Sequence, residues 1–220
     1  MKAQQHENSQ DAVVNQRKLT RTQMQNQERI LAAALTEFSR FGFRGTTVDQ
    51  IAAGSGMSKA NILYYFRRKN DIYLAVLEKT LDNWLAPLQS MNPHGDPQEE
   101  LWNYIKTKIR LSRTAPEASR LFASEILQGA PLLKPFLETE LKDVVDKNCK
   151  VLQQWIDEGK LVDAPPLHLV FMIWAATQHY ADFATQINAL TADAEDQIFS
   201  DAETTMQKVL LRGMLTTPRH

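Results

Sequence analysis

Apolar residues recur at helical spacing through most of this chain. A first stripe, with spacings of three and four residues, predicts a helix over about 25–41 and comprises Ile30, Leu31, Ala34, Leu35 and Phe38. Strand-like alternation is scarce, and the 220 residues contain only eight glycines and nine prolines. The pattern therefore predicts an all-α fold.

Glycines, prolines and polar loops divide the rest of the chain into further helices. Besides the first helix we expect two short helices within 45–66 and six longer ones, nine in total, at about 69–87, 99–113, 116–128, 132–158, 166–187 and 195–215. Residues 1–21 lack this pattern and are predicted to be a flexible tail. We expect the rest to form two domains: three helices over 22–70, and a larger helical domain over 71–220.

The pattern of residues 45–66 predicts two short helices joined by a turn that contains glycine. Thr47 and Gln50 have the spacing of a capping box, which starts the first of these helices. Gly54 or Gly56 can adopt the positive φ that ends it, and Ser58 can cap the second. This arrangement is typical of a helix-turn-helix reader of DNA.

The second short helix carries side chains suited to a major groove. Lys59 and Asn61 follow the capping Ser58 and are placed to read base edges. Hydroxyls and cations nearby are placed to hold phosphates, and these are Thr46, Thr47, Tyr64, Tyr65 and Lys69. The alternative is an ordinary helical hairpin with solvated polar residues.

The distribution of charge favours the DNA-binding interpretation. Residues 17–69 contain ten Lys and Arg against three Asp and Glu, a local charge of +7, although the whole chain has a formal charge of −1. A basic domain on a nearly neutral chain is the electrostatic signature of phosphate binding.

Other classes of function have less support. The sequence has no phosphate-binding glycine loop, no nucleophile elbow and no histidine cluster for zinc, so neither an enzyme nor a cofactor is expected. A helical protein whose basic face binds another acidic partner remains an alternative. The single cysteine, Cys149, suits packing in a reducing cytoplasm. No apolar run approaches the roughly 18 residues of a membrane span.

The N-terminal part resembles the DNA-binding domain of the TetR family of transcriptional regulators. The resemblance rests on the run ILAAALTEFSRFGFRGTTVDQIAAGSGMSKANILYYF. It implies a homodimeric repressor that binds double-stranded operator DNA until a small-molecule effector changes the affinity. Lys69 matches a lysine of the family pattern. Leu63 departs from it, because the family often has a tyrosine there for a phosphate contact.

The C-terminal part is similar to one branch of that family, the regulators of pyrimidine utilisation. The likeness is carried by LAVLEKTLDNWLAPL, SRLFASEILQGAPLL and EGKLVDAPPLHLVFMIWAATQHYADFATQI. It implies that the effector is uracil or a related pyrimidine. An amide such as Gln178 can pair with the imide edge of uracil, and Trp174, one turn earlier, can stack on the ring.

We expect the remaining contacts of this ligand from Trp84, Leu85, Phe122 and either Arg120 or Ser124. The alternatives are that these aromatic residues are ordinary core residues, that Gln178 is a satisfied buried amide, and that the effector is another small molecule.

The last two predicted helices are apolar enough for an interface between two copies. Residues 167–176 are apolar almost all round, and the helix over 195–215 has its own apolar stripe. We expect a four-helix dimer interface, with an internal core as the alternative. His179 is expected to be a structural or interface residue. The helix that follows Lys69 is expected to relay the effector signal.

Overall fold

The computed structural model describes residues 20–216, and these confirm the predicted all-α fold. Apart from an isolated bridge between Leu161 and Leu215, the described residues form no β-structure. The helices are α1 (Arg21–Gly45), α2 (Val48–Ser55), α3 (Lys59–Tyr65), α4 (Lys69–Gln89), α5 (Pro97–Thr114), α6 (Pro116–Leu127), α7 (Lys134–Phe136), α8 (Lys142–Asp157), α9 (Pro166–Asp182), α10 (Ala184–Leu190), α11 (Glu195–Thr205) and α12 (Arg212–Met214).

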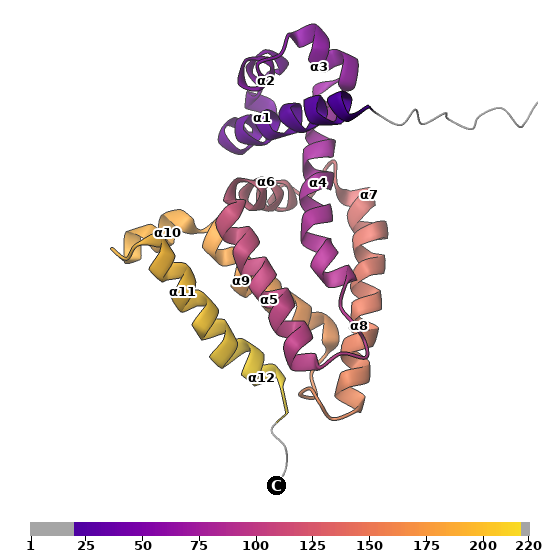
Figure 1. Cartoon of the computed structure of the whole chain (residues 1–220), viewed down its shortest axis with the longest axis vertical. Coiled ribbons are helices and arrows are strands. Elements are labelled where there is room, and N and C mark those ends of the chain that lie inside the picture. Colours follow the sequence, from indigo (N-terminus) through magenta and orange to yellow (C-terminus); the bar gives the residue numbers. More distant parts are fainter. Residues whose placement is uncertain (1–19, 217–220) are drawn as a thin grey trace, which may run out of the picture.

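Helices α1–α3 form a compact group at one end of the molecule (Figure 1). Helix α1 begins earlier than predicted, because Thr20 and Gln23 form a capping box at its start. Gly42, with φ of 69°, interrupts α1 before its last turn. Of the predicted tail, residues 1–19 lie outside the described part of the chain.

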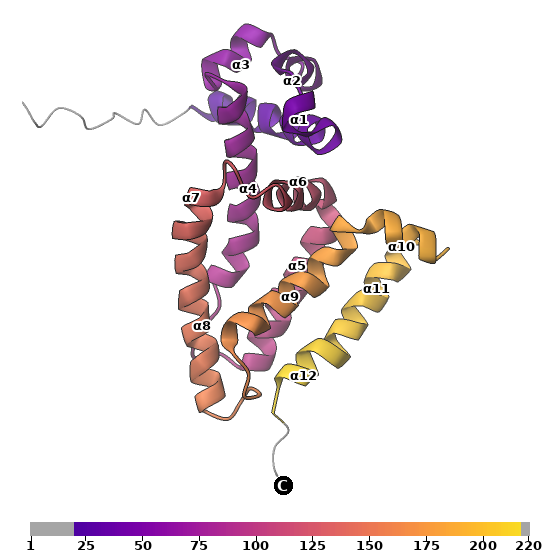
Figure 2. The ribbon, with the colours of Figure 1, turned by 180° about the vertical axis from the view of Figure 1, so that it is seen from behind.

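Helix α4 leaves this group and runs into the larger C-terminal bundle (Figures 1 and 2). Its first half buries Ile72, Tyr73 and Leu77 in the core of the DNA-binding end, together with residues of α1 and α6. Its last turns bury Leu88 in the core of the bundle. A single helix therefore contributes to both hydrophobic cores. The expected division after residue 70 stays a prediction.

Helices α5, α8, α9 and α11 surround the second core, which contains Trp155, Ile105 and Ile173. Helix α6 lies across the top of this bundle and packs on α1 and α4 (Figure 1). Helix α9 lies on the face of the bundle that Figure 2 shows. No helix among residues 20–216 has the length and apolar character needed to cross a bilayer.

Three predicted long helices contain irregularities that the pattern did not reveal. The helix expected over 132–158 contains a π-helical stretch, η1 (Leu137–Leu141), between α7 and α8. A second π-helical stretch, η2 (Met206–Leu211), joins α11 to α12. The helix expected over 166–187 stops at Asp182, because Phe183 leaves the helical conformation before α10 begins. These breaks correct the predicted boundaries.

Candidate DNA-binding surface and effector chamber

The turn between α2 and α3 is fixed by hydrogen bonds from short polar side chains. The Thr47 hydroxyl accepts a bond from the Gln50 backbone amide at 3.2 Å, and the Gln50 side chain accepts one from the Thr47 backbone amide at 2.7 Å. Gly56 ends α2 with φ of 65°. The Ser58 hydroxyl then accepts a bond from the Asn61 amide at 3.2 Å and caps α3. The predicted helix-turn-helix geometry is confirmed.

One face of α3 packs on the core and the opposite face is open to solvent. Ile62 is fully buried and Phe66 nearly so, whereas Lys59, Asn61 and Tyr64 are exposed. The ammonium group of Lys59 lies 2.8 Å from the Asp49 carboxylate of α2, and both side chains are more than half exposed. Lys59 and Asn61 therefore lie where a DNA groove could reach them.

Two tyrosines at the end of α3 are linked to α1. The Tyr64 hydroxyl accepts a bond from the Gln23 side chain at 3.5 Å, and the Tyr65 hydroxyl accepts one from Asn26 at 3.1 Å. The Tyr64 side chain is 73% exposed, whereas Tyr65 is half-buried. The rings meet edge to face, with centroids 5.2 Å apart. Tyr64 is therefore more accessible to a DNA backbone than Tyr65 is.

Thr46 and Lys69 were expected to hold phosphates, but the structure uses them inside the domain. Thr46 is 1% exposed, and its hydroxyl donates to the backbone oxygens of Glu37 and Gly42. The Lys69 ammonium donates to the oxygens of Phe43 and Thr46 at 2.7 and 2.8 Å. It also lies 4.5 Å from the centroid of the Phe43 ring. The Thr46 side chain therefore bonds within the end of α1 and is not open to a phosphate, contrary to expectation. Lys69 joins that end to α4, and its contact with a phosphate stays a prediction.

Arg67 and Arg68 were not singled out among the expected contacts, yet both are exposed directly after α3. Arg68 pairs with Asp71 at 3.3 Å at the surface, and such an exposed pair is weak. The signal was present in the sequence, because two adjacent arginines follow the second short helix. Phosphates beside α3 would lie within their reach.

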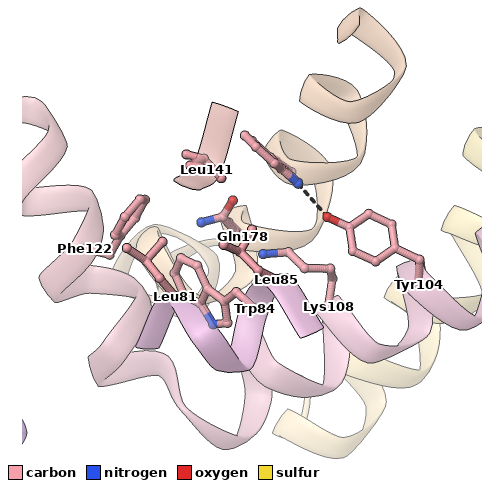
Figure 3. Close-up of a pocket in the computed structure, with 9 residues that line it drawn as sticks. Leu81, Trp84, Leu85, Tyr104, Lys108, Phe122, Leu141 and Gln178 are labelled. Atoms are coloured by element: carbon pink, nitrogen blue, oxygen red, sulfur yellow. Dashed lines mark hydrogen bonds between the residues drawn. The ribbon is translucent and has the colours of Figure 1, made fainter. Parts of the chain in front are cut away.

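Aromatic and aliphatic side chains line a narrow pocket between α4, α5, α6, η1 and α9, with about 330 Å³ of empty space, part of which is open to solvent (Figure 3). Its lining consists of Leu81, Trp84, Leu85, Tyr104, Lys108, Phe122, Leu141, Trp174 and Gln178. Five of these, Trp84, Leu85, Phe122, Trp174 and Gln178, are residues that the sequence analysis assigned to one chamber. We call this cavity the chamber.

The polar groups of the chamber come from α5 and α9. The Trp174 indole donates to the Tyr104 hydroxyl at 2.6 Å, so this hydroxyl retains its own proton for another acceptor. Burial raises the pKa of Tyr104, although the bond from Trp174 opposes the shift. In Figure 3 the Gln178 amide points into the space between the apolar side chains. Tyr104 therefore remains a neutral donor in the lining that also holds this amide.

Lys108 is the most unusual group in the chamber. It is 3% exposed, and no hydrogen bond or ion pair joins its ammonium to another residue within 20–216. The nitrogen lies 4.3 Å from the centroid of the Trp84 ring. Burial lowers the pKa of Lys108 to about 7, and the charge of Asp182 only partly opposes this. The amine lines the pocket and has no acceptor within the described part of the chain, so the chamber is suited to a ligand that supplies one.

Arg120 and Ser124 were expected in the chamber, but both point elsewhere. The Arg120 guanidinium donates to the Ala181 backbone oxygen at 3.4 Å, and the Ser124 hydroxyl accepts from the Gln128 side chain at 3.1 Å. Two residues along an α-helix correspond to a rotation of about 200°. Because Phe122 faces the chamber, its neighbours two positions away on α6 face away from it. Tyr104 and Lys108 supply the polar contacts instead.

Helix α6 connects the chamber to the DNA-binding end. Its Phe122 ring meets Trp84 edge to face at 5.2 Å, and its Ser119 hydroxyl donates to Asp182 at 2.5 Å. At the other end of α6, Glu125 is buried and accepts a bond from the Tyr73 hydroxyl of α4 at 3.0 Å. Burial and this carboxylate raise the pKa of Tyr73. A shift of α6 would therefore move groups bonded to α4.

His179 and Cys149, which were considered as a metal ligand and as a redox-active thiol, have the surroundings of structural residues. The His179 ring stacks on Phe183 with centroids 4.9 Å apart. Burial raises the pKa of Cys149, which opposes formation of a reactive thiolate. Residues 20–216 contain no group of three or more His, Cys, Asp and Glu that could hold a metal ion.

A capped helix-turn-helix on a basic domain, joined to a helical bundle with a pocket, is the architecture of a DNA-binding regulator. Comparison with known proteins agrees with this class. Residues 30–76 match the family described as bacterial regulatory proteins, tetR family, and residues 77–217 match the C-terminal region of YcdC-like proteins. The chain belongs to the TetR family, and it is a transcriptional regulator of the TetR type and not an enzyme.

Individual relatives support the same assignment. The HTH-type transcriptional regulator RutR of Escherichia coli K12 is 44% identical over 208 residues, which cover 94% of this chain and 98% of RutR. The ketosteroid regulator KstR2 of Mycobacterium tuberculosis superposes with a TM-score of 0.69 at 18% identity, over 87% of this chain and 95% of KstR2. A TetR-family regulator of Marinobacter aquaeolei superposes with a TM-score of 0.70 at 18% identity, over 90% and 100% of the two chains.

Proposed function

We propose that this regulator is a cytoplasmic homodimeric repressor whose effector is uracil or a related pyrimidine, bound in the chamber. The observation that carries the proposal is the pairing of two polar groups in an aromatic enclosure. Gln178 offers an acceptor and two donors, and the buried Lys108 lacks an acceptor of its own. Uracil is a flat ring with an imide edge of carbonyl, N–H and carbonyl, which complements both groups.

In the proposed complex, the Gln178 amide forms two hydrogen bonds with the imide edge. The Lys108 amine donates to a carbonyl oxygen of the ring, and the Tyr104 hydroxyl is available as a second donor. Trp174 and Trp84 lie on the lining of the same cavity and provide aromatic faces for the ring. This set of groups favours a small planar ligand with several acceptors over a purely apolar one.

For DNA, we propose that α3 enters the major groove. Lys59 and Asn61 read base edges there, while Thr47, Tyr64 and Tyr65 contact the backbone and Ser58 holds the start of the helix in place. The exposure of these groups on one side of the domain supports the assignment. Thr46 and Lys69 act indirectly, Thr46 by bonding within the end of α1 and Lys69 by joining that end to α4.

The dimer is proposed to form through α9 and the segment α11–η2. The outer face of α9 is apolar, with Leu167, Phe171 and Met172 between 40 and 53% exposed, and Val209 of η2 is 69% exposed. Apolar helix faces of this kind are typical of an isologous interface. In such a dimer, the two copies of α3 must lie about 34–36 Å apart to occupy successive major grooves.

The signal is proposed to pass from the chamber through α4 and α6. The effector must bind one arrangement of the dimer more tightly than the other, because equal affinity would shift no equilibrium. Trp84 and Leu85 on α4 and Phe122 on α6 touch the chamber directly. The Tyr73–Glu125 bond ties the same two helices together nearer to the DNA-binding end.

Thermal unfolding of the dimer with and without uracil tests the effector. A ligand present at 100 times its Kd stabilises the folded state by about 2.7 kcal/mol, and uracil should raise the Tm accordingly. 1,3-Dimethyluracil lacks the imide N–H and should raise it far less. Gln178→Leu should abolish the response, whereas Gln153→Leu, at an exposed position on α8, should leave it intact.

A DNA-binding assay tests the regulatory step. The probe is a duplex selected by the protein from a random pool, and its affinity is measured by fluorescence anisotropy as uracil is added. Operator affinity should fall with uracil, and it should fall steeply with salt in either case. Binding of uracil without any change in operator affinity would overturn the relay, and absence of uracil binding would leave another small molecule as the effector.

A further inference from the structure

The recognition helix exposes an apolar stripe beside its polar residues. Ala60, Leu63 and Tyr64 are exposed, and their spacing of three and four places them on one face of α3. The Leu63 side chain is 40% exposed and is not part of the core at the DNA-binding end. About two fifths of its surface is therefore available to a partner.

An ion pair at the start of α3 competes with contacts between Lys59 and the bases of DNA. The Lys59 ammonium is engaged with Asp49 at 2.8 Å, so a contact with a base acceptor would compete with this ion pair. Asn61 is exposed, and its side chain forms no hydrogen bond with another residue in the described range. Polar readout on α3 thus rests on Asn61 and on Lys59, which must first leave its exposed and weak pair with Asp49, while the surface of Ala60 and Leu63 is hydrocarbon.

In a major groove, the one base feature that favours a hydrocarbon partner is the C5-methyl group of thymine. We infer that Leu63, with Ala60 one turn before it, reads a thymine methyl in each half of the operator. The inference rests on the proposed entry of α3 into the major groove. Leu63 is thus a specificity-determining residue at a position where the family pattern has a phosphate-binding tyrosine.

The test removes only the methyl group from DNA. The probe is the duplex selected by the wild-type protein from a random pool, resynthesised with deoxyuridine in place of each thymine in turn. Deoxyuridine keeps base pairing and the O4 acceptor. At one or two thymines per half-site, the substitution should weaken binding about fourfold, since burial of one such carbon group corresponds to about 0.8 kcal/mol.

Variants at Leu63 connect the methyl effect to this side chain. Leu63→Ala should bind thymine and deoxyuridine probes with affinities that differ less than twofold at those positions. Leu63→Met, which keeps a flexible apolar side chain, should retain the difference. Leu127→Ala, at a leucine 87% exposed at the end of α6, is the matched control and should behave like the wild type.

The outcomes separate the inference from the function on which it rests. Specific binding that is insensitive to deoxyuridine at every thymine would overturn the methyl readout and leave DNA binding by α3 intact. A methyl effect that persists unchanged in Leu63→Ala would overturn the role of Leu63. Failure of the wild-type protein to select any sequence would overturn both.

Discussion

Two lysines show how differently the two ends of this molecule are built. Lys69, at the DNA-binding end, donates to two backbone oxygens and lies over an aromatic ring. Lys108, in the chamber, also lies over an aromatic ring, but it has no acceptor within the described chain. The lysine at the DNA-binding end is therefore paired within the protein, whereas the lysine of the chamber has no protein acceptor among residues 20–216 and faces the pocket.

The largest expected change in the free energy of unfolding comes from removing the Lys108 amine. Lys108→Met should raise the free energy of unfolding by roughly 4 kcal/mol at neutral pH, because burial displaces the pKa from 10.5 to about 7 and each unit corresponds to about 1.4 kcal/mol. It should also abolish the response to uracil. Chemical denaturation measures the first effect, and Lys106→Met, at an exposed position on the same helix, is the control. A loss of stability in Lys108→Met would show that the amine is satisfied after all.

The lowered pKa of Lys108 should also make the free energy of unfolding depend on pH. With a folded-state pKa of about 7 against 10.5 in the unfolded chain, the unfolded state binds the extra proton between these values. Stability should therefore rise with pH above 7, with a slope of up to about 1.4 kcal/mol per unit, and this lysine contributes no slope well below 7. Unfolding measured from about pH 7 to pH 9.5, below the titration of tyrosine, tests this. The slope should be reduced in Lys108→Met.

For Lys69 we expect the opposite effect, a loss of stability on substitution. Lys69→Met should lower the free energy of unfolding by about 2 kcal/mol, because it removes charge-assisted hydrogen bonds to the end of α1. Operator affinity should fall in parallel. Lys79→Met, which removes an exposed pair with Glu28 at 4.0 Å, should change stability little. If Lys69→Met weakened DNA binding without lowering stability, Lys69 would be a phosphate contact as first expected.

A smaller effect, confined to recognition, is expected on α3. Asn61→Ala should reduce discrimination between the selected operator and unrelated DNA by about 1–3 kcal/mol for each half-site. Thermal stability should be unchanged, because it is the backbone amide of Asn61, and not its side chain, that bonds to Ser58. Competition binding measures the discrimination, and Ser58→Ala provides the contrast, since loss of the cap should lower stability.

Local signals in the sequence were sufficient for the helix-turn-helix. The capping box at Thr47 and the cap at Ser58 depend on residues three positions apart, so they could be recognised without tertiary information. The equivalent signal at Thr20 and Gln23 was overlooked, which displaced the predicted start of α1. The internal bonds of Thr46 could not be predicted, because they depend on the interruption of α1 at Gly42, which brings the Glu37 oxygen nine residues earlier within reach.

The chamber depended on contacts between distant helices and was predicted less well. Aromatic residues and Gln178 were identified on three helices, α4, α6 and α9, but Lys108 was missed on a fourth, α5. Its signal is visible in retrospect, since it is the one charged residue on the buried face of α5 formed by Leu101, Tyr104, Ile105 and Ile109. Helical rotation alone excludes Arg120 and Ser124 once Phe122 is placed inside.

The position of α4 in both hydrophobic cores has a consequence for how the chain folds. Residues 22–70 without α4 would lack Ile72, Tyr73 and Leu77, and would expose the apolar side chains that these residues cover. An isolated fragment of that length should therefore fail to fold on its own. Heating the intact protein should melt both ends in one cooperative transition.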